Sequence, residues 1–321
     1  MSKPSYSSDA ISGMERGKSV LLTFGKPGRI LKRKIALTGF ICRVLLFFVF
    51  NPVFMLRVRF ASGKPSSKLT KPGNEHDIWY RRKIAALRVV RMLCPFDTTG
   101  HKVEESPCGH VAVINHPTLN DPICGVVYIL SRFPDREIIV PVNLPWFESV
   151  CRYRSKLRKI GINLVPILTP QTAMRLGENE NIRSVQSAFM ANYVAGFVDT
   201  LSRNGLAIVA QQATRQRYLF ANPAQAESGE GILSTVTLLL LSLKRAKLLE
   251  QTLFVPVGVI PHSLSAKPRL NILRKYELNV GKPIPAMDLS AVKNAAKRPA
   301  DLHVLRKLME LVPSDYHYES T

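Results

Sequence analysis

Short apolar runs alternate with helical stretches from about residue 100 onward, and this alternation constrains the fold more than any other feature of the chain. The runs have the length and composition of buried strands, and they cover residues 110–115, 137–142, 162–168, 205–210 and 253–260. Helical patterns separate them over residues 121–133, 147–159, 182–203 and 231–249. Alternation of this kind predicts an α/β fold with a mostly parallel central sheet flanked by helices.

The region before this domain is basic and contains a long apolar run. No Asp or Glu occurs between Arg16 and Asn74, and residues 35–56 are apolar except at Arg43 and Asn51. A central Arg disfavours a clean transmembrane span by about 2.5–3.5 kcal/mol, and positive charge on both flanks gives no orientation signal. We expect two short helices that dip into one leaflet; a hairpin buried against the domain is the alternative.

These patterns divide the chain into four parts. Residues 1–34 form a basic N-terminal segment, residues 35–60 hydrophobic membrane-docking helices, and residues 61–77 a Gly-, Pro- and Ser-containing linker. Residues 78–321 form the α/β domain, which begins with a basic amphipathic helix over residues 78–93. The expected localisation is membrane-associated and facing the cytoplasm, with a monotopic or single re-entrant N-terminal segment.

The charge balance points to an anionic partner. Lys and Arg number 45 against 23 acidic residues, a net charge of +22. Such an excess suits an anionic bilayer surface, a phosphorylated substrate or nucleic acid. No helix-turn-helix, zinc-finger or aromatic-rich RNA-binding signature accompanies it, so nucleic acid is not the expected partner. The five scattered cysteines show no metal-ligand spacing, and we expect no metal site.

One turn between a predicted strand and a predicted helix carries residues suited to catalysis. His116 and Asp121 lie between residues 110–115 and the helical stretch that follows, where an α/β domain exposes reactive side chains. A carboxylate that holds a His leaves its second ring nitrogen free to take a proton from a hydroxyl. The competing interpretation is structural: Asp121 before Pro122 is also a good helix N-cap.

The surrounding heptapeptide Asn-His-Pro-Thr-Leu-Asn-Asp, residues 115–121, favours catalysis. It resembles the first motif of the glycerolipid acyltransferases, the family that includes lysophosphatidic acid acyltransferases. Asn115, His116, Pro117, Thr118 and Asp121 match that motif. The resemblance extends with falling quality from about residue 100 to about residue 290. It implies that His116 is the general base and Asp121 its orienting acid, with Asn115 at the substrate.

A second block resembles the family only in part. The predicted strand over residues 206–210 runs into Gln211-Gln212-Ala213-Thr214-Arg215, where the family has Pro-Glu-Gly-Thr-Arg. The resemblance implies substrate contacts from Gln212, Thr214 and Arg215, with Arg215 binding an anionic group. Gln212 replaces the family's acid, and Ile167 stands where a third block usually has an Arg.

These residues together predict an O-acyltransferase that resembles 1-acylglycerol-3-phosphate acyltransferases. The expected reaction moves a fatty acyl group from an acyl thioester to a hydroxyl of a lysophospholipid or related lipid. Acyl-CoA or an acylated acyl carrier protein would be the donor substrate, with no permanently bound cofactor. Two alternatives stay open: a glycolipid or amino-acid lipid as acceptor, and a non-catalytic peripheral lipid-binding protein.

Overall fold

The computed structural model describes two compact units of this chain. The described residues are 75–104, 106–116, 121–177, 180–210, 218–262, 275–292 and 298–319. The larger unit comprises Glu75–Val140, Lys159–Asn163 and Gly196–Thr321, and the smaller unit includes Pro141–Arg158 and Leu164–Ala195. The expected segments 1–34 and 35–60, and the linker up to residue 74, lie outside the described residues, so the membrane-docking prediction for them stays a prediction.

The chain forms a sheet whose central strands are parallel, and most of its strands belong to the larger unit. Its described strands follow the order β1-β7-β6-β2-β5-β3-β4, and β8 also pairs with β6. Strand β2 is parallel to β5 and β6, and β3 is parallel to β5, whereas β7 runs antiparallel to β6. The bounds are β1 (Phe96–Gly100), β2 (Gly109–Ile114), β3 (Ile138–Asn143), β4 (Ile162–Ile167), β5 (Leu206–Ala210), β6 (Thr252–Pro261), β7 (Tyr276–Val280) and β8 (Ile284–Pro285).

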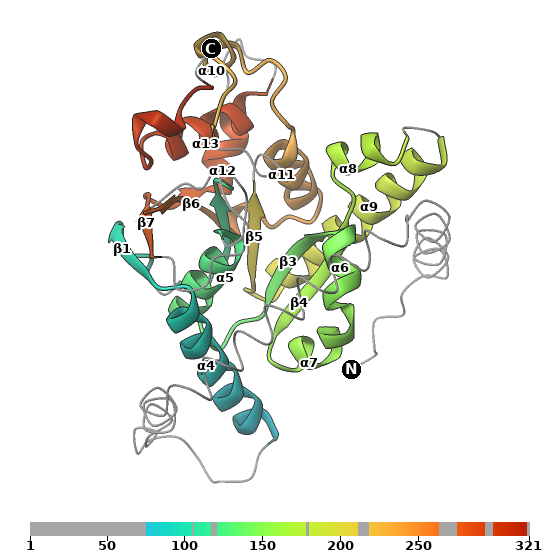
Figure 1. The fold of residues 1–321 in the computed structure, drawn as a ribbon, viewed down its shortest axis with the longest axis vertical. Coiled ribbons are helices and arrows are strands. Elements are labelled where there is room, and N and C mark those ends of the chain that lie inside the picture. Colours follow the sequence, from blue (N-terminus) through green and yellow to red (C-terminus); the bar gives the residue numbers. More distant parts are fainter. Residues whose placement is uncertain are drawn as a thin grey trace. The chain divides into compact units, whose positions relative to one another are not determined.

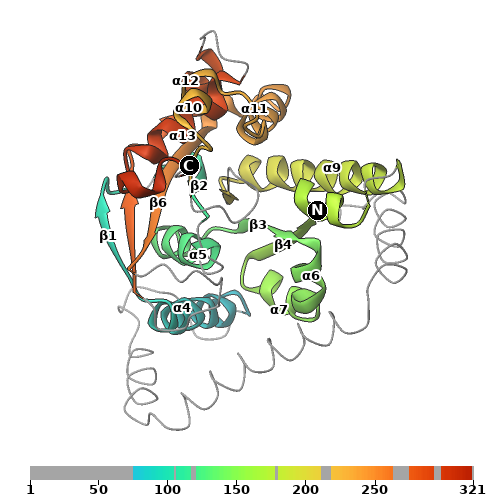
Figure 2. The ribbon, with the colours of Figure 1, turned by 45° about the horizontal axis from the view of Figure 1, so that its top comes forward.

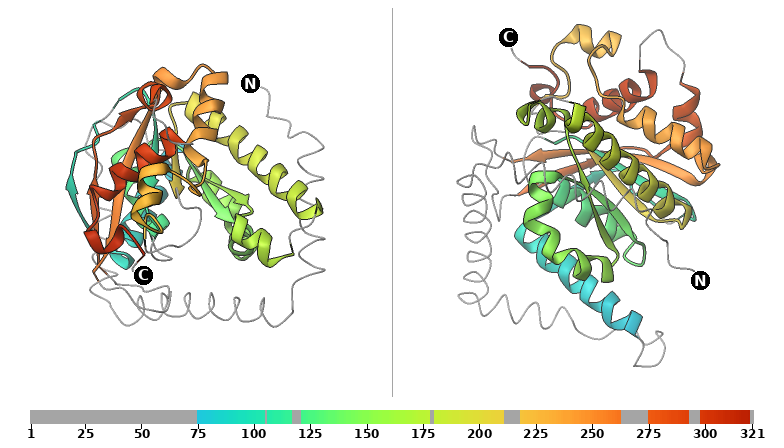
Figure 3. Two further views of the ribbon diagram at one scale, coloured as in Figure 1. Left: turned by 90° about the horizontal axis from the view of Figure 1, so that it is seen from above. Right: turned by 90° about the vertical axis from the view of Figure 1, so that its right-hand side faces the viewer.

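Helices cover both faces of this sheet, so that the larger unit has three layers (Figures 2 and 3). On one face α5 packs on the sheet and α4 packs on α5; α13 lies on the other face, near α11 and α12. The bounds are α4 (Glu75–Leu93), α5 (Asp121–Arg132), α10 (Pro223–Ser228), α11 (Thr235–Arg245), α12 (Ala286–Ala291) and α13 (Pro299–Met309).

Helix α5 approaches the sheet closely because of a glycine in its middle. A Cβ atom at Gly125 would lie 2.7 Å from Cδ1 of Ile208 on β5 and 3.3 Å from Cγ2 of Ile114 on β2. A larger side chain here would require Ile208 or the helix to shift. Gly125 therefore allows the close approach of α5 to the two strands.

The smaller unit is mainly helical. It contains α6 (Leu144–Val150), the short 3₁₀ helix η1 (Cys151–Tyr153), α8 (Pro170–Arg175) and the first part of α9 (Glu180–Ser202). Helix α7 (Arg154–Lys159) ends at its border. Its core joins residues from these helices: Leu144, Leu168, Ala173, Ile182, Val185 and Phe189. Thr169 caps α8 by accepting from the Thr172 N–H, and the Gln186 side chain donates to the Leu168 carbonyl at 3.1 Å.

The predicted α/β fold with a mostly parallel central sheet is confirmed, and the five predicted strands lie within one residue of β2 to β6 at each end (Figure 1). Several details differ. The basic helix begins at Glu75, three residues inside the predicted linker. The helix predicted over residues 147–159 is instead α6, η1 and α7 in succession. Elements that were not predicted are strands β1, β7 and β8 and helices α8, α10, α12 and α13. Strand β1, for instance, reads as a polar turn, Phe-Asp-Thr-Thr-Gly.

Within the part of the chain that the structure describes, no helix combines the length and apolar character needed to cross a bilayer.

Candidate active site

The side chain of Asn115 anchors the end of the central strand β2. Its Nδ2 donates to the Val259 carbonyl at 3.0 Å, and its Oδ1 accepts from the Val259 N–H at 2.6 Å. The amide thus extends the β2–β6 ladder by one rung beyond the Ile114–Val257 pair. Asn115 is 1% exposed, so a buried polar side chain here requires these partners. Its described contacts position the chain; a contact with substrate stays a prediction.

His116 follows this anchored residue directly and lies at the carboxyl edge of the sheet. All six residues of β2 are buried, whereas His116 is half-buried. The chain therefore passes from the packed core towards solvent between Asn115 and His116. A rigid anchor one residue before a half-exposed imidazole is an arrangement that holds the ring in place while leaving it accessible to a ligand.

The second member of the predicted dyad is placed only by its backbone. Asp121 is the first residue of α5, and Pro122 occupies the first turn of that helix. The side chain of Asp121 and residues 117–120 lie outside what the structure describes. The strand-to-helix context that the sequence predicted is confirmed, and the His116–Asp121 contact remains a prediction.

The strand register brings the two motif blocks to one edge of the sheet. Ile114 pairs with Ala210, so β2 and β5 end at the same level. From Ala210 the chain enters the block that contains Gln212, Thr214 and Arg215. These three residues belong to 211–217, outside the described residues. Their roles therefore stay predictions, while the starting points of both blocks, Asn115 and residue 211, follow paired strand ends.

A second histidine, His110, occupies the opposite end of β2 and is wholly buried. Its pKa is lowered to about 4, chiefly by burial and then by the nearby Arg136 charge, against the opposing effect of a hydrogen bond to the Cys108 backbone. Arg136 Nη1 lies 3.3 Å from the His110 Nδ1. Among the described residues Nε2 has no hydrogen-bond partner.

Arg136 ties this amino-terminal end together. Its guanidinium donates to the Cys108 carbonyl at 2.7 Å and to the Ser106 carbonyl, and it stacks on the Phe133 ring at 4.5 Å. The buried Lys83 donates to the Arg136 carbonyl at 2.5 Å. Burial lowers the pKa of Lys83 to about 8, against the opposing charges of Asp135 and Glu137. These contacts explain His110 and Arg136 as structural residues, and the sequence alone did not single them out.

No described group of three or more His, Cys, Asp or Glu side chains could hold a metal ion.

Comparison with known proteins gives similarity at the level of structure. No family model matches the chain, and no curated protein matches it. The structure is similar to the crystal structure of the 1-acyl-sn-glycerophosphate (LPA) acyltransferase, PlsC, from Thermotoga maritima, with 12% sequence identity and a TM-score of 0.39. The match covers 87% of this chain and 95% of that one.

Proposed function

We propose that the chain is an acyltransferase that moves a fatty acyl group from an acyl thioester to a lipid hydroxyl. The observation that carries the proposal is the register of β2 with β5. The pairing of Ile114 with Ala210 starts the Asn115–Asp121 motif and the Gln212–Arg215 block at one edge of the sheet. A base and an anion contact are needed close together for this reaction, and their two sequence blocks begin side by side.

In the proposed reaction His116 takes the proton of the acceptor hydroxyl, and Asp121 orients and stabilises the resulting imidazolium. The acceptor oxygen then attacks the thioester carbonyl, and the thiol leaves after the tetrahedral intermediate collapses. The proton held by His116 passes to the departing sulfur, which completes the proton balance. Backbone N–H groups at the start of α5 are the proposed donors to the oxyanion, because the first N–H groups of a helix lack intrahelical partners.

The acceptor is proposed to be a lysophospholipid or related lipid at a membrane surface. An exposed stretch of the smaller unit supports a bilayer partner. Trp146 on α6 is 43% exposed and Tyr153 on η1 is 37% exposed. Four basic side chains lie in the same stretch, namely Arg152, Arg154, Lys156 and Arg158. Arg154 is partly buried, and the other three are exposed. Aromatic rings and cations in one exposed stretch suit the headgroup region of an anionic membrane.

The glycolipid or amino-acid-lipid alternative rests on Gln212 and Ile167. Ile167 is the last residue of β4 and is partly buried. Because its side chain is apolar, it offers no positive charge to a phosphate. An acceptor without a phosphate would not need that charge. Acyl-CoA and an acylated carrier protein are both proposed as donors to be compared, and the protein is proposed to work on the cytoplasmic face of the membrane.

The test is acyl transfer by the purified full chain. Two donors are compared, acyl-CoA and acylated acyl carrier protein, each with a labelled acyl group. Each donor is mixed with lysophosphatidic acid, a lysophospholipid with a larger headgroup, or a hydroxylated glycolipid. The proposal expects a labelled product that depends on His116 and Asp121. His116→Ala and Asp121→Asn should each lower kcat/KM by roughly 10²–10⁴-fold, the usual contribution of general acid–base catalysis.

Undiminished acyl transfer by His116→Ala would show that His116 is not the general base. Absence of transfer to every acceptor, with vesicle binding retained, would favour the non-catalytic lipid-binding alternative.

A further inference from the structure

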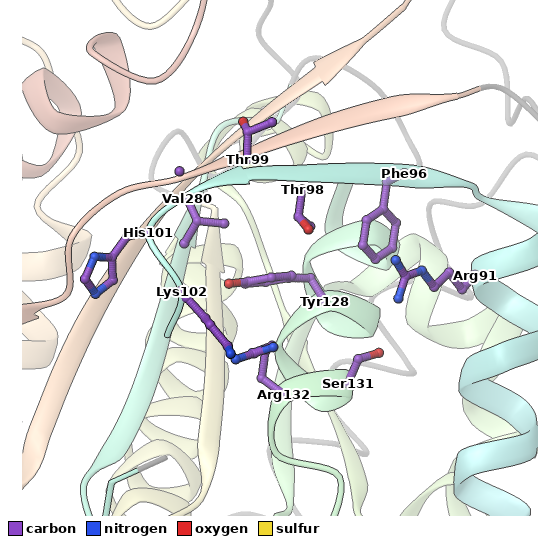
Figure 4. A pocket seen from close by; sticks show the side chains of 11 residues that line it. Arg91, Phe96, Thr98, Thr99, His101, Lys102, Tyr128, Ser131, Arg132 and Val280 are labelled. Atoms are coloured by element: carbon purple, nitrogen blue, oxygen red, sulfur yellow. The ribbon is translucent and has the colours of Figure 1, made fainter. Parts of the chain in front are cut away.

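A pocket of about 330 Å³ lies in the larger unit, between β1, the end of β7 and the end of α5 (Figure 4). All of its lining residues are described, and none belongs to the residues proposed for catalysis. Its volume falls at the lower end of the range for small-molecule sites. The pocket therefore has room for a ligand larger than an isolated inorganic ion.

The floor and the rim of this pocket differ in chemistry. Phe96, Tyr128 and Val280 line it and are 5%, 5% and 2% exposed, so they form a buried, largely apolar floor. Three of the exposed lining residues carry cations, and the others are small or neutral apart from His101: Arg91, Lys102 and Arg132 are the cations. No Asp or Glu is among the residues that line the pocket. The rim therefore concentrates positive charge without a neutralising carboxylate of its own.

Two of the three cations are oriented by specific contacts. Arg132 Nη2 donates to the Val103 carbonyl at 3.1 Å, which places the guanidinium beside the backbone that carries Lys102. Arg91 stacks on the Phe96 ring at 4.9 Å. Figure 4 shows the side chains of Lys102 and Arg132 both directed into the pocket. Like charges held close together are unfavourable, and an anion between them would relieve that cost.

The nearest acid on the same strand already has a partner. Asp97 pairs with Lys275 at 2.6 Å. The bond to Lys275 is the main cause that lowers the pKa of Asp97, and the Arg91 charge adds only a smaller effect. The Asp97 carboxylate therefore forms its ion pair with Lys275 and not with a cation of the rim.

Neutral donors complete the lining. The Thr98 hydroxyl and the Tyr128 hydroxyl both point into the pocket in Figure 4. Burial raises the pKa of Tyr128, so its hydroxyl stays protonated and can donate at neutral pH. A phosphate oxygen accepts hydrogen bonds from guanidinium, ammonium and hydroxyl groups alike. Cations of both kinds and two hydroxyls fit a tetrahedral anion better than a planar carboxylate.

We propose that this pocket binds a phosphate monoester, through Arg91, Lys102 and Arg132 on the rim and the Tyr128 hydroxyl at the floor. The site is separate from the proposed acyl-transfer residues, and the proposal stands without that activity. The phosphate could belong to a soluble metabolite or to a lipid headgroup, since both present the same dianion. The apolar floor would contact the uncharged part of either ligand.

The test is a calorimetric titration of the full chain with inorganic phosphate at constant ionic strength. Lys102→Gln should weaken binding about tenfold, because one charge-assisted hydrogen bond contributes about 1.5 kcal/mol or more. Tyr128→Phe leaves the net charge unchanged and should weaken binding by a smaller factor. The control is Lys244→Gln, which removes the same charge from an exposed site on α11 and should leave the affinity unchanged.

Absence of saturable phosphate binding by the unmodified chain would overturn the proposal. Equal losses in Lys102→Gln and Lys244→Gln would overturn it as well, because they would reveal an effect of net charge alone. Co-sedimentation with phosphatidylcholine vesicles, with and without phosphatidic acid, distinguishes the two sources. If Lys102→Gln and Tyr128→Phe both bind less to vesicles with phosphatidic acid, the ligand is a lipid headgroup. If both variants bind those vesicles normally but bind inorganic phosphate more weakly, the ligand is soluble.

Discussion

The two ends of strand β2 each carry a histidine, and the two histidines have opposite environments. His116 is half-buried at the carboxyl end, one residue beyond the Asn115 anchor. His110 is fully buried at the amino end beside Arg136, with a pKa lowered to about 4. The first environment allows an imidazole to meet a ligand and exchange a proton. The second keeps the ring neutral and buried, so His110 packs in the core, whereas His116 is the histidine that we propose for chemistry.

The contrast also concerns how each end is held. At the carboxyl end a single side-chain amide makes two hydrogen bonds to one partner residue. At the amino end Arg136 and Lys83 link several carbonyls and a ring. The carboxyl end thus depends on one side chain and one partner residue, whereas the amino end depends on a network of several groups. Substitutions at the two ends should therefore have separable effects.

The largest effect on stability is expected at the carboxyl end, from Asn115→Ala. This change leaves the buried N–H and carbonyl of Val259 without partners and should lower the free energy of unfolding by about 3 kcal/mol. Acyl transfer should also fall in molecules that remain folded, because the support of His116 is lost. Denaturant unfolding and the transfer assay measure the two effects.

The control for this change is Asn222→Ala, which removes an exposed amide that caps α10 and should cost only about 1 kcal/mol. If both variants lost the same small amount, the bonds to Val259 would not anchor the end of β2.

At the amino end, acid should destabilise the protein through His110. Its pKa is about 4 in the folded state and lowered from 6.5. Between pH 6.5 and about 4, His110 is protonated in the unfolded chain but remains neutral in the folded chain. Stability is therefore lost as the pH falls through this window, by about 3 kcal/mol, because a tenfold change in proton affinity corresponds to about 1.36 kcal/mol.

His110→Leu should remove this contribution and flatten the stability profile between pH 6.5 and 4. The measurement is urea unfolding across that range, with His101→Leu as a matched replacement at an exposed site. An unchanged acid slope in His110→Leu would show that the buried ring is not the group responsible.

Replacing the guanidinium of the same cluster is expected to have a moderate effect. Arg136→Met frees the carbonyls of Ser106 and Cys108 and should cost about 2 kcal/mol. It should also raise the pKa of His110, because the Arg136 charge is one of its lowering causes. Arg136→Lys keeps the positive charge but loses the planar guanidinium that donates to two carbonyls. It should therefore destabilise the fold without raising the pKa of His110. NMR titration of His110 separates the two variants.

The last effect is confined to alkaline pH and comes from Lys83. Its pKa is lowered to about 8 from 10.5, so between these values the unfolded chain holds more protons than the folded chain. Stability should accordingly rise as the pH increases from 8 towards 10.5. Lys83→Met should lose this rise, whereas the exposed Lys282→Met should keep it. Unfolding midpoints across this range provide the measurement, and identical profiles for both variants would refute the assignment.

Sequence patterns predicted the parts of the molecule that depend on local periodicity. The buried runs of β2 and β6 and the start of α5 at Asp121 follow from apolar content and turn chemistry. Strand β1 escaped prediction because its stability comes from pairing with β7, a partner about 180 residues away in the chain. Long-range pairing leaves no local pattern, so the pocket beside β1 could not be predicted from the sequence either.

The candidate site divides in the same way. The turn that carries His116 could be predicted, because strand, motif and helix follow one another in sequence. Asn115 was expected at the substrate, yet its described bonds go to Val259, 144 residues further along the chain. The role of Arg136 likewise depends on carbonyls about 30 residues earlier. Contacts between distant segments are decided by packing, which a single sequence does not display.

The division between the two histidines is tested most directly by replacing each with glutamine and measuring acyl transfer and unfolding in the same preparations. We expect His116→Gln to lower kcat/KM by roughly 10²–10⁴-fold while its unfolding midpoint at neutral pH stays unchanged. His110→Gln should retain transfer and alter the acid dependence of unfolding. Full transfer by His116→Gln, or loss of transfer by a folded His110→Gln, would contradict the account.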